Sequence, residues 1–247
     1  MRRTSARVLP LLLSALLSFS AAGCTPPEGH PPRQGSAQPS PQAFDGRQPA
    51  TPLSYQHADW LEREGRDQME KPEIVIEAMN LKDGDQVADI GAGTGFFSRR
   101  LARAVAPNGK VYAEEIQPQM LRLLEQHSAE EGIRNIVSVL GTDTDPRLPR
   151  GHFDWVLLVD VYHEFQDPQA MLAKIRACLK PGGRVALVEY RLEGDTAKQI
   201  PVAHRMSVEQ VLKEWSPAGF ELVETIETLP SQHLFLFTTH RGARASP

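Results

Sequence analysis

Three glycines at alternate positions, Gly91, Gly93 and Gly95, give the sequence its clearest chemical signal. They follow a short apolar segment that carries a carboxylate, Asp89. Glycines let a backbone turn tightly, because they adopt φ values that other residues avoid. Apolar residues then recur at helical spacing from Phe97, so the pattern predicts a strand, a glycine turn and a helix. This arrangement forms nucleotide pockets at the carboxyl edge of a parallel sheet.

The residues around the glycine turn indicate which nucleotide it would hold. The dinucleotide fingerprint G-x-G-x-x-G needs a third glycine where this chain has Phe96, which disfavours a nicotinamide oxidoreductase. A phosphate-binding P-loop needs a lysine, and the turn contains none. We therefore predict a pocket for a nucleoside without phosphates.

The segment Asp89-Ile90-Gly91-Ala92-Gly93-Thr94-Gly95 resembles motif I of the class I S-adenosylmethionine-dependent methyltransferases. The resemblance implies S-adenosyl-L-methionine as the cofactor, with Asp89 and the three glycines in its binding site. The methionine carboxylate of the cofactor would lie at the helix N-terminus after Gly95, where free N–H groups face anions.

A second strand is expected over 110–116, and it ends in two acids. A carboxylate at this position accepts hydrogen bonds from ribose hydroxyls. The segment VYAEEIQPQML resembles the strand-two pattern of the same family, which assigns this role to Glu115 rather than to Glu114 and places Ile116 on the adenine face.

A third strand, Ile136–Leu140, is followed by a turn rich in Gly, Asp and Thr. The resemblance implies an acid here that binds the adenine amino group, and we select Asp143 over Asp145. A plain turn without a ligand is an equal alternative, since these residue types favour turns in any case.

The fourth predicted strand, Asp154–Val159, holds an unbroken apolar run, as expected for a central strand buried on both faces. It ends in Asp160-Val161-Tyr162-His163, which differs from the Asp/Asn-Pro-Pro-Tyr of exocyclic-amine methyltransferases. Asp160 is a candidate to face the cofactor's cation, with Asp89. His163 is the candidate base for a hydroxyl or carbon acid, and a structural histidine is the alternative.

Two more residues, Tyr190 and His204, border the same edge with weaker support. The histidines have no ligand spacing in the sequence that suggests a metal, so none is predicted. Cys178 is expected to be a packing residue.

The segment LKPGGRVALVEY also resembles class I methyltransferases. The resemblance implies an α/β, Rossmann-like sheet of seven mostly parallel strands, with helices on both faces and an antiparallel last strand. We expect a helix with Leu179 on its core face that stops at Lys180–Gly183, and then a strand over Val185–Tyr190. Two final strands are expected over 220–226 and 233–238.

Residues 1–23 have the pattern of an export signal. Three arginines precede an apolar segment, Val8–Phe19, that is too short to span a bilayer. Ala21-Ala22-Gly23-Cys24 then resembles a bacterial lipobox, which implies cleavage before Cys24 and lipid attachment to its thiol. The expected location is the cell envelope, anchored to a membrane as a lipoprotein. Ordinary secretion is the alternative, and an unprocessed signal would leave the protein cytoplasmic.

Composition divides the rest of the chain into two parts. Residues 24–54 are rich in Pro, Gln and Ser and predict a disordered tether, because such a segment buries little apolar surface. Residues 55–242 are assigned to the methyltransferase domain. The resemblance implies that the helices ahead of motif I cover the cofactor, so four residues are candidate lid residues: His57, Trp60, Arg63 and Arg66. A solvated helix with one buried tryptophan is the alternative.

The net charge and the motifs together limit the partners. The chain of 247 residues has a formal charge of −4 and no long basic run, which argues against nucleic-acid binding. We predict transfer of a methyl group to a small molecule, similar to enzymes of quinone biosynthesis, and no protein partner. The alternative is a non-catalytic envelope protein that binds S-adenosylmethionine or another nucleoside, since the signal predicts export whereas the cofactor is made in the cytoplasm.

Overall fold

The computed structural model describes residues 47–239 of the chain. Cys24, the export signal and most of the predicted tether lie outside these residues, as do residues 240–242 of the predicted domain. Within the described range, no helix combines the length and the apolar character needed to cross a membrane.

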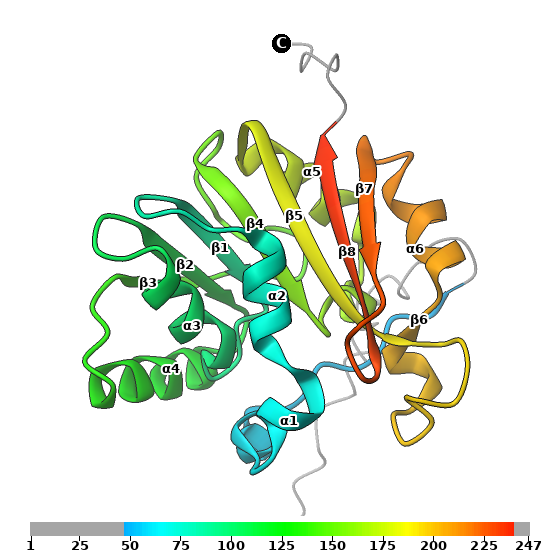
Figure 1. Cartoon of the computed structure of the whole chain (residues 1–247), viewed down its shortest axis with the longest axis horizontal. Helices are drawn as coiled ribbons and strands as arrows, with labels where there is room; N and C mark the ends of the chain where they lie inside the picture. Colours follow the sequence, from blue (N-terminus) through cyan, green and yellow to red (C-terminus); the bar gives the residue numbers. More distant parts are fainter. Residues whose placement is uncertain (1–46, 240–247) are drawn as a thin grey trace, which may run out of the picture. The chain divides into compact units, whose positions relative to one another are not determined.

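One mixed sheet forms the centre of the fold, in the order β3-β2-β1-β4-β5-β8-β7 (Figure 1). The pairs among β1 to β5 are parallel, whereas β8 runs antiparallel to both β5 and β7. A short eighth strand, β6, pairs with β5 off this path. The strands are β1 (Gln86–Ile90), β2 (Lys110–Glu115), β3 (Ile136–Leu140), β4 (Phe153–Val159), β5 (Leu179–Arg191), β6 (Arg205–Met206), β7 (Phe220–Ile226) and β8 (Gln232–Thr239).

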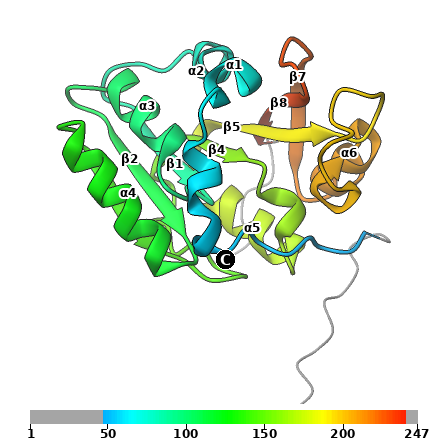
Figure 2. The same cartoon turned by 90° about the horizontal axis from the view of Figure 1, so that it is seen from below.

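Helices cover both faces of this sheet (Figure 2). The α-helices are α1 (Arg66–Glu70), α2 (Pro72–Met79), α3 (Phe96–Ala104), α4 (Pro118–Glu130), α5 (Pro168–Cys178) and α6 (Val208–Trp215). Three 3₁₀ helices are η1 (Tyr55–Glu62), η2 (Tyr162–Glu164) and η3 (Val202–His204). The predicted fold class is therefore confirmed.

Strand alternation divides the apolar residues between two cores. In β1, Val87 faces the core of α2 and α3, whereas Ala88 and Ile90 face the core of α5 and α6. Trp215 of α6 is fully buried in the second core and stacks on Phe237 of β8, with ring centroids 4.6 Å apart. Burial on both faces explains the unbroken apolar run of β4.

The junction of α5 and β5 differs from the prediction. Leu179 was expected on the helix, but α5 ends at Cys178 and Leu179 is already extended, where it pairs with Phe153 of β4. The Lys180–Gly183 segment belongs to β5, and the register of the β4–β5 pair shifts there. Pairing with β4 therefore overrides the helical spacing of Leu179.

Residues 47–54 lie on the domain although their composition predicted a tether. The Arg47 guanidinium donates to both carboxylate oxygens of Glu214 and to the carbonyl of His163. The Ala50 amide donates to the same carbonyl, and Ala50 is buried. Among the described residues, the domain's contacts therefore begin at Arg47.

Candidate active site

The carboxyl ends of β1, β2 and β4 open into one cavity of about 910 Å³. Its lining includes Asp89, Gly91, Gly93, Glu115, Ile116, Asp143, Asp160, His163, Tyr190 and His204. The four candidate lid residues also line it. Gly95 is the exception among the predicted site residues, because it caps α3 and its α-carbon lies against Leu124. The other predicted cofactor-binding residues and His163 therefore line a single cavity.

The glycine turn depends on backbone conformations that suit glycine. Gly91, Gly93 and Gly95 have φ angles of +70°, +54° and +85°. A Cβ on Gly91 would lie 2.4 Å from a methyl group of Val161, and a Cβ on Gly93 would lie 2.7 Å from Leu61. Both the backbone and the neighbours thus exclude larger residues here.

Asp89 lies at the end of β1 beneath the turn. It is 3% exposed, and the Ser98 hydroxyl donates to its carboxylate at 2.5 Å. Burial raises the pKa of Asp89 to about 7, and the hydrogen bond from Ser98 opposes the rise. A cationic ligand in the cavity would stabilise its ionised form.

The two acids at the end of β2 are both buried and both line the cavity. Glu115 accepts hydrogen bonds from the amides of Gly93 and Gln117. Glu114 accepts one from Gly91, and its other oxygen has no hydrogen-bond partner among the described residues. Burial and the charge of Glu115 raise the pKa of Glu114 to about 8. The sequence prediction selected Glu115 alone, whereas the structure brings both to the site.

The turn after β3 separates its two candidate acids. Asp143 is exposed and lines the cavity. Asp145 forms an ion pair with Lys174 at 2.8 Å and accepts from the Arg147 amide instead. Its pKa is lowered by the hydrogen bond from Lys174. Asp143 is therefore the acid available to a ligand.

Asp160, the first residue after β4, holds an unusual conformation. Its φ is +50°, a left-handed value that is rare outside glycine. Gln232 donates to one carboxylate oxygen at 2.7 Å, and the other is buried without a partner among the described residues. Burial and the neighbouring charges of Glu70 and Glu189 raise the pKa of Asp160 well above its ordinary value. Such strain and missing pairing are typical of functional positions.

His163 lies in η2, which begins two residues after Asp160. Its Nδ1 is 2.6 Å from a carboxylate oxygen of Glu189, which is fully buried on β5. The other oxygen of Glu189 accepts from the backbone amides of Tyr162 and His163, so it fixes the whole turn. Burial opposes protonation of the imidazole, but the charge and the hydrogen bond of Glu189, together with the charge of Glu164, outweigh it and raise the pKa of His163.

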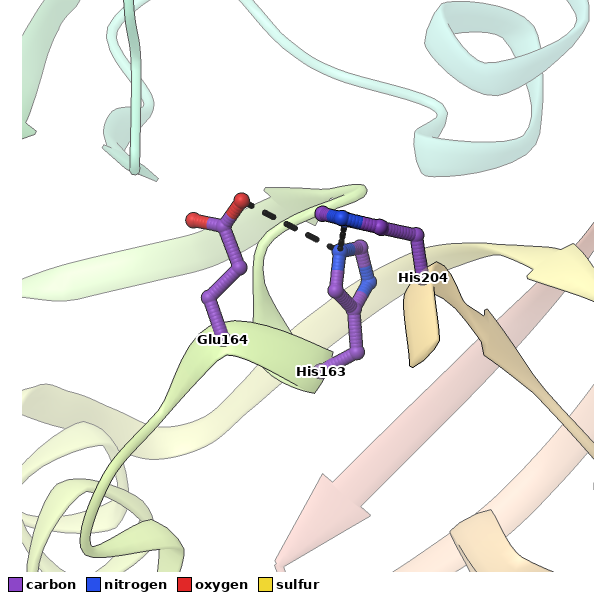
Figure 3. Close-up of side chains that lie close together, drawn as sticks. All are labelled: His163, Glu164 and His204. Carbon is purple, nitrogen blue, oxygen red and sulfur yellow. Dashed lines mark hydrogen bonds and ion pairs between the residues drawn. The ribbon is translucent and has the colours of Figure 1, made fainter. Parts of the chain in front are cut away.

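His204 of η3, 41 residues further along the chain, lies beside the ring of His163 (Figure 3). Its Nδ1 lies 3.0 Å from Nε2 of His163. Burial and the positive charge of His163 lower the pKa of His204. Glu164 lies beside both rings, and burial raises its pKa to about 7.

Sequence analysis assigned no role to Glu189 and Glu164. Glu189 is a lone acid in an apolar strand. Because a buried charge requires a partner, this position could have indicated that Glu189 pairs with another polar side chain. For Glu164, the only indication in the sequence was its position beside His163.

The first helical segment closes the cavity. Glu62 of η1 accepts from the Thr94 hydroxyl at 2.6 Å and pairs with Arg99, which fastens η1 to the glycine turn. Trp60 is 51% exposed and stacks beneath Arg63. Arg66 is buried and pairs with Glu70 at 2.9 Å.

These features fit an adenosyl sulfonium. The glycine turn admits a close ligand, Glu115 provides hydrogen-bond acceptors, and Asp160 offers an unpartnered carboxylate oxygen to a cation. The cavity is also large enough for a cofactor and a second small molecule.

Comparisons with known proteins agree with this geometry. Residues 87–183 match the family model described as "Methyltransferase domain". The ubiquinone/menaquinone biosynthesis C-methyltransferase UbiE of Burkholderia cenocepacia is 32% identical over 126 residues, which are 51% of each chain. The chain thus spans about half the length of the curated relatives it matches.

Two solved structures share the fold. A SAM-dependent methyltransferase from Aquifex aeolicus has a TM-score of 0.72 and 23% identity, over 76% of this chain and all of that one. The [4+2]-cyclase SpnF has a TM-score of 0.60 and 17% identity, over 72% of this chain and 85% of that one. The comparisons confirm the predicted fold, and residues 87–183 match a methyltransferase domain. Because the fold also carries a cyclase, it does not define the reaction by itself.

Proposed function

We propose that the protein transfers a methyl group from S-adenosylmethionine to a small-molecule acceptor. One observation carries the proposal: a single cavity joins the glycine turn and the buried acids Asp89 and Glu115 to the His163–Glu189 pair. The first group of residues suits a nucleoside with a positive charge, and the second suits an acceptor that loses a proton.

The cofactor, when bound, supplies a methyl group that is already activated by its sulfonium. The protein therefore has to hold the acceptor, exclude water and accept a proton. Glu189 occupies Nδ1 of His163, so the ring offers the lone pair of Nε2 to the cavity. The imidazolium that results from proton transfer would be stabilised by the Glu189 carboxylate.

A hydroxyl or acidic carbon on a small ring is the acceptor that we favour. The cavity lining is largely apolar, and this suits a flat hydrophobic molecule such as a quinol. The likeness to UbiE, whose name describes a C-methyltransferase of quinone biosynthesis, supports the same choice.

Calorimetry and a transfer assay test this proposal in two steps. Titration with S-adenosylmethionine and S-adenosylhomocysteine should show one site per chain, and NADH should not compete. Incubation with methyl-labelled cofactor and a panel of reduced quinones, catechols and cell extracts should then yield a labelled small molecule. Binding without transfer to any acceptor would favour the non-catalytic binding protein. Absence of binding would contradict both.

We also propose that the protein is lipid-anchored at the cell envelope through Cys24. The lipobox-like segment supports this, together with the small residues that precede Cys24. Labelled palmitate should appear on the wild-type chain and be absent from Cys24→Ala. An unlabelled wild-type chain in the soluble fraction would refute the anchor.

A further inference from the structure

Three potential metal ligands converge on one side of the cavity. His163 and Glu164 are neighbours in η2, and His204 comes from η3 (Figure 3). One ligand atom from each side chain lies within 4.8 Å of the other two. His163 is buried, whereas Glu164 and His204 are partly exposed to the cavity.

The hydrogen bond to Glu189 determines which nitrogen of His163 is available. A carboxylate accepts, so Nδ1 carries the proton and Nε2 keeps its lone pair. That lone pair lies 3.0 Å from Nδ1 of His204. Without a cation, one proton must lie between the two nitrogens. A metal ion would replace this proton and use both lone pairs.

We propose that His163, His204 and Glu164 bind a divalent transition-metal ion inside the cavity. Two ligands at ~2.1 Å from a metal, at right angles, stand ~3 Å apart, and the two imidazole nitrogens have this separation. The Glu164 carboxylate lies 3.9 Å from Nε2 of His163 and needs only a side-chain rotation to complete the set.

The hydrogen bond from His163 to Glu189 is of the kind that supports histidines bound to metals. Metal-bound histidines commonly donate their other ring N–H to a carboxylate, which fixes the ring and increases its basicity. Glu189 provides this carboxylate at 2.6 Å and is itself held by two backbone amides.

The donor set indicates the class of metal. Two imidazoles and one carboxylate suit zinc, iron(II) or manganese(II), whereas magnesium and calcium prefer oxygen ligands. Three protein ligands on one side leave positions open toward the cavity, where an oxygen of a second molecule can bind. Metal binding can be tested without the cofactor. It also competes with the base role proposed above, because a bound ion would occupy the Nε2 lone pair of His163 that a base needs.

Cobalt(II) and zinc titrations of the chelator-treated full chain test the proposal. We expect one ion per chain with micromolar or tighter affinity, and ligand-field absorption of cobalt that zinc abolishes. His204→Ala and Glu164→Gln should each weaken binding by at least ~10-fold. Both side chains are partly exposed, so these variants should fold, as circular dichroism can verify.

His57→Ala is the matched control, because His57 lines the same cavity outside the cluster. It should bind cobalt as the wild type does. Only millimolar affinity in the wild type, or affinity unchanged in both His204→Ala and Glu164→Gln, would overturn the proposal. Either result can be read whether or not the protein binds S-adenosylmethionine.

Discussion

Nδ1 of His163 lies 2.6 Å from a fully buried carboxylate oxygen of Glu189. The two residues come from different elements, η2 and β5, and the β4–β5 pairing brings them together. This contact defines the tautomer of His163 and therefore what its other nitrogen can do.

Glu189→Gln should change the chemistry of His163 while the turn is retained. The amide oxygen can still accept from the Tyr162 and His163 amides, but its NH₂ would face Nδ1 and move the ring proton to Nε2. We expect methyl transfer to fall by about 100-fold, with cofactor affinity within a factor of about three. His163→Ala should give the same pattern. Turnover at the wild-type rate in either variant would contradict the assigned role.

Gly93→Arg should abolish cofactor binding in calorimetry. The residue has a φ of +54°, and any side chain there would meet Leu61 and fill the turn. Gly84→Ala is the control, because Gly84 also has a positive φ, +93°, but has open space around it. That control should lose about 1–2 kcal/mol of stability and still bind the cofactor. Binding by Gly93→Arg would place the nucleoside elsewhere.

Stability of the ligand-free protein should fall as the pH rises, partly because of Glu114. Its pKa is about 8 in the fold against an ordinary value of 4.5, so between these values the folded state holds a proton that the unfolded state releases. The stabilisation is complete below pH 4.5 and is lost between there and pH 8. Glu114→Gln should be more stable than wild type at pH 9, by about 1–3 kcal/mol.

Thermal unfolding from pH 5 to pH 9 measures this effect. Glu125→Gln is the control, since Glu125 is exposed on α4, and its pH profile should match the wild type. Identical profiles for Glu114→Gln and the wild type would show that Glu114 is ionised throughout.

Cys178 should resist thiol reagents in the native protein. It is 1% exposed, its thiol lies 3.0 Å from the Ile175 carbonyl, and burial raises its pKa to about 12. In a Cys24→Ala chain, labelling by iodoacetamide should therefore follow global unfolding, since the reactive thiolate is scarce. Rapid labelling below the unfolding transition would contradict the packing role.

Trp60 should report cofactor binding by fluorescence. It is half exposed at the cavity, whereas Trp155 and Trp215 are buried in the cores. A ligand that orders η1 should shift the emission of Trp60, and Trp60→Phe should remove the shift while calorimetry still detects binding. A shift that persists in Trp60→Phe would assign the signal to another residue.

The sequence predicted the parts of the site that depend on neighbouring residues. The glycine turn and Asp89 follow from local spacing, because a strand and the turn after it are continuous in the chain, and the resemblance to the methyltransferases selected Glu115. The contacts of Glu189 and His204 with His163 could not be predicted in this way. The first depends on strand pairing, and the second depends on the path of a long loop. The prediction for Leu179 was wrong for the opposite reason. Its helical spacing placed it on the preceding helix, whereas in the structure it pairs with β4.

The contacts of Arg47 with Glu214 and with the carbonyl of His163 have a practical consequence for any shortened version of the protein. Glu214 is fully buried, and its charge is neutralised by Arg47 from outside the predicted domain boundary at residue 55. A chain trimmed to that boundary would leave this buried carboxylate without its cation, while the hydrogen bonds from Tyr162 and Gln210 remain, at a cost of about 3 kcal/mol. It would also release the carbonyl of His163. Such a fragment should keep the glycine turn in order, while the turn that carries His163 loosens.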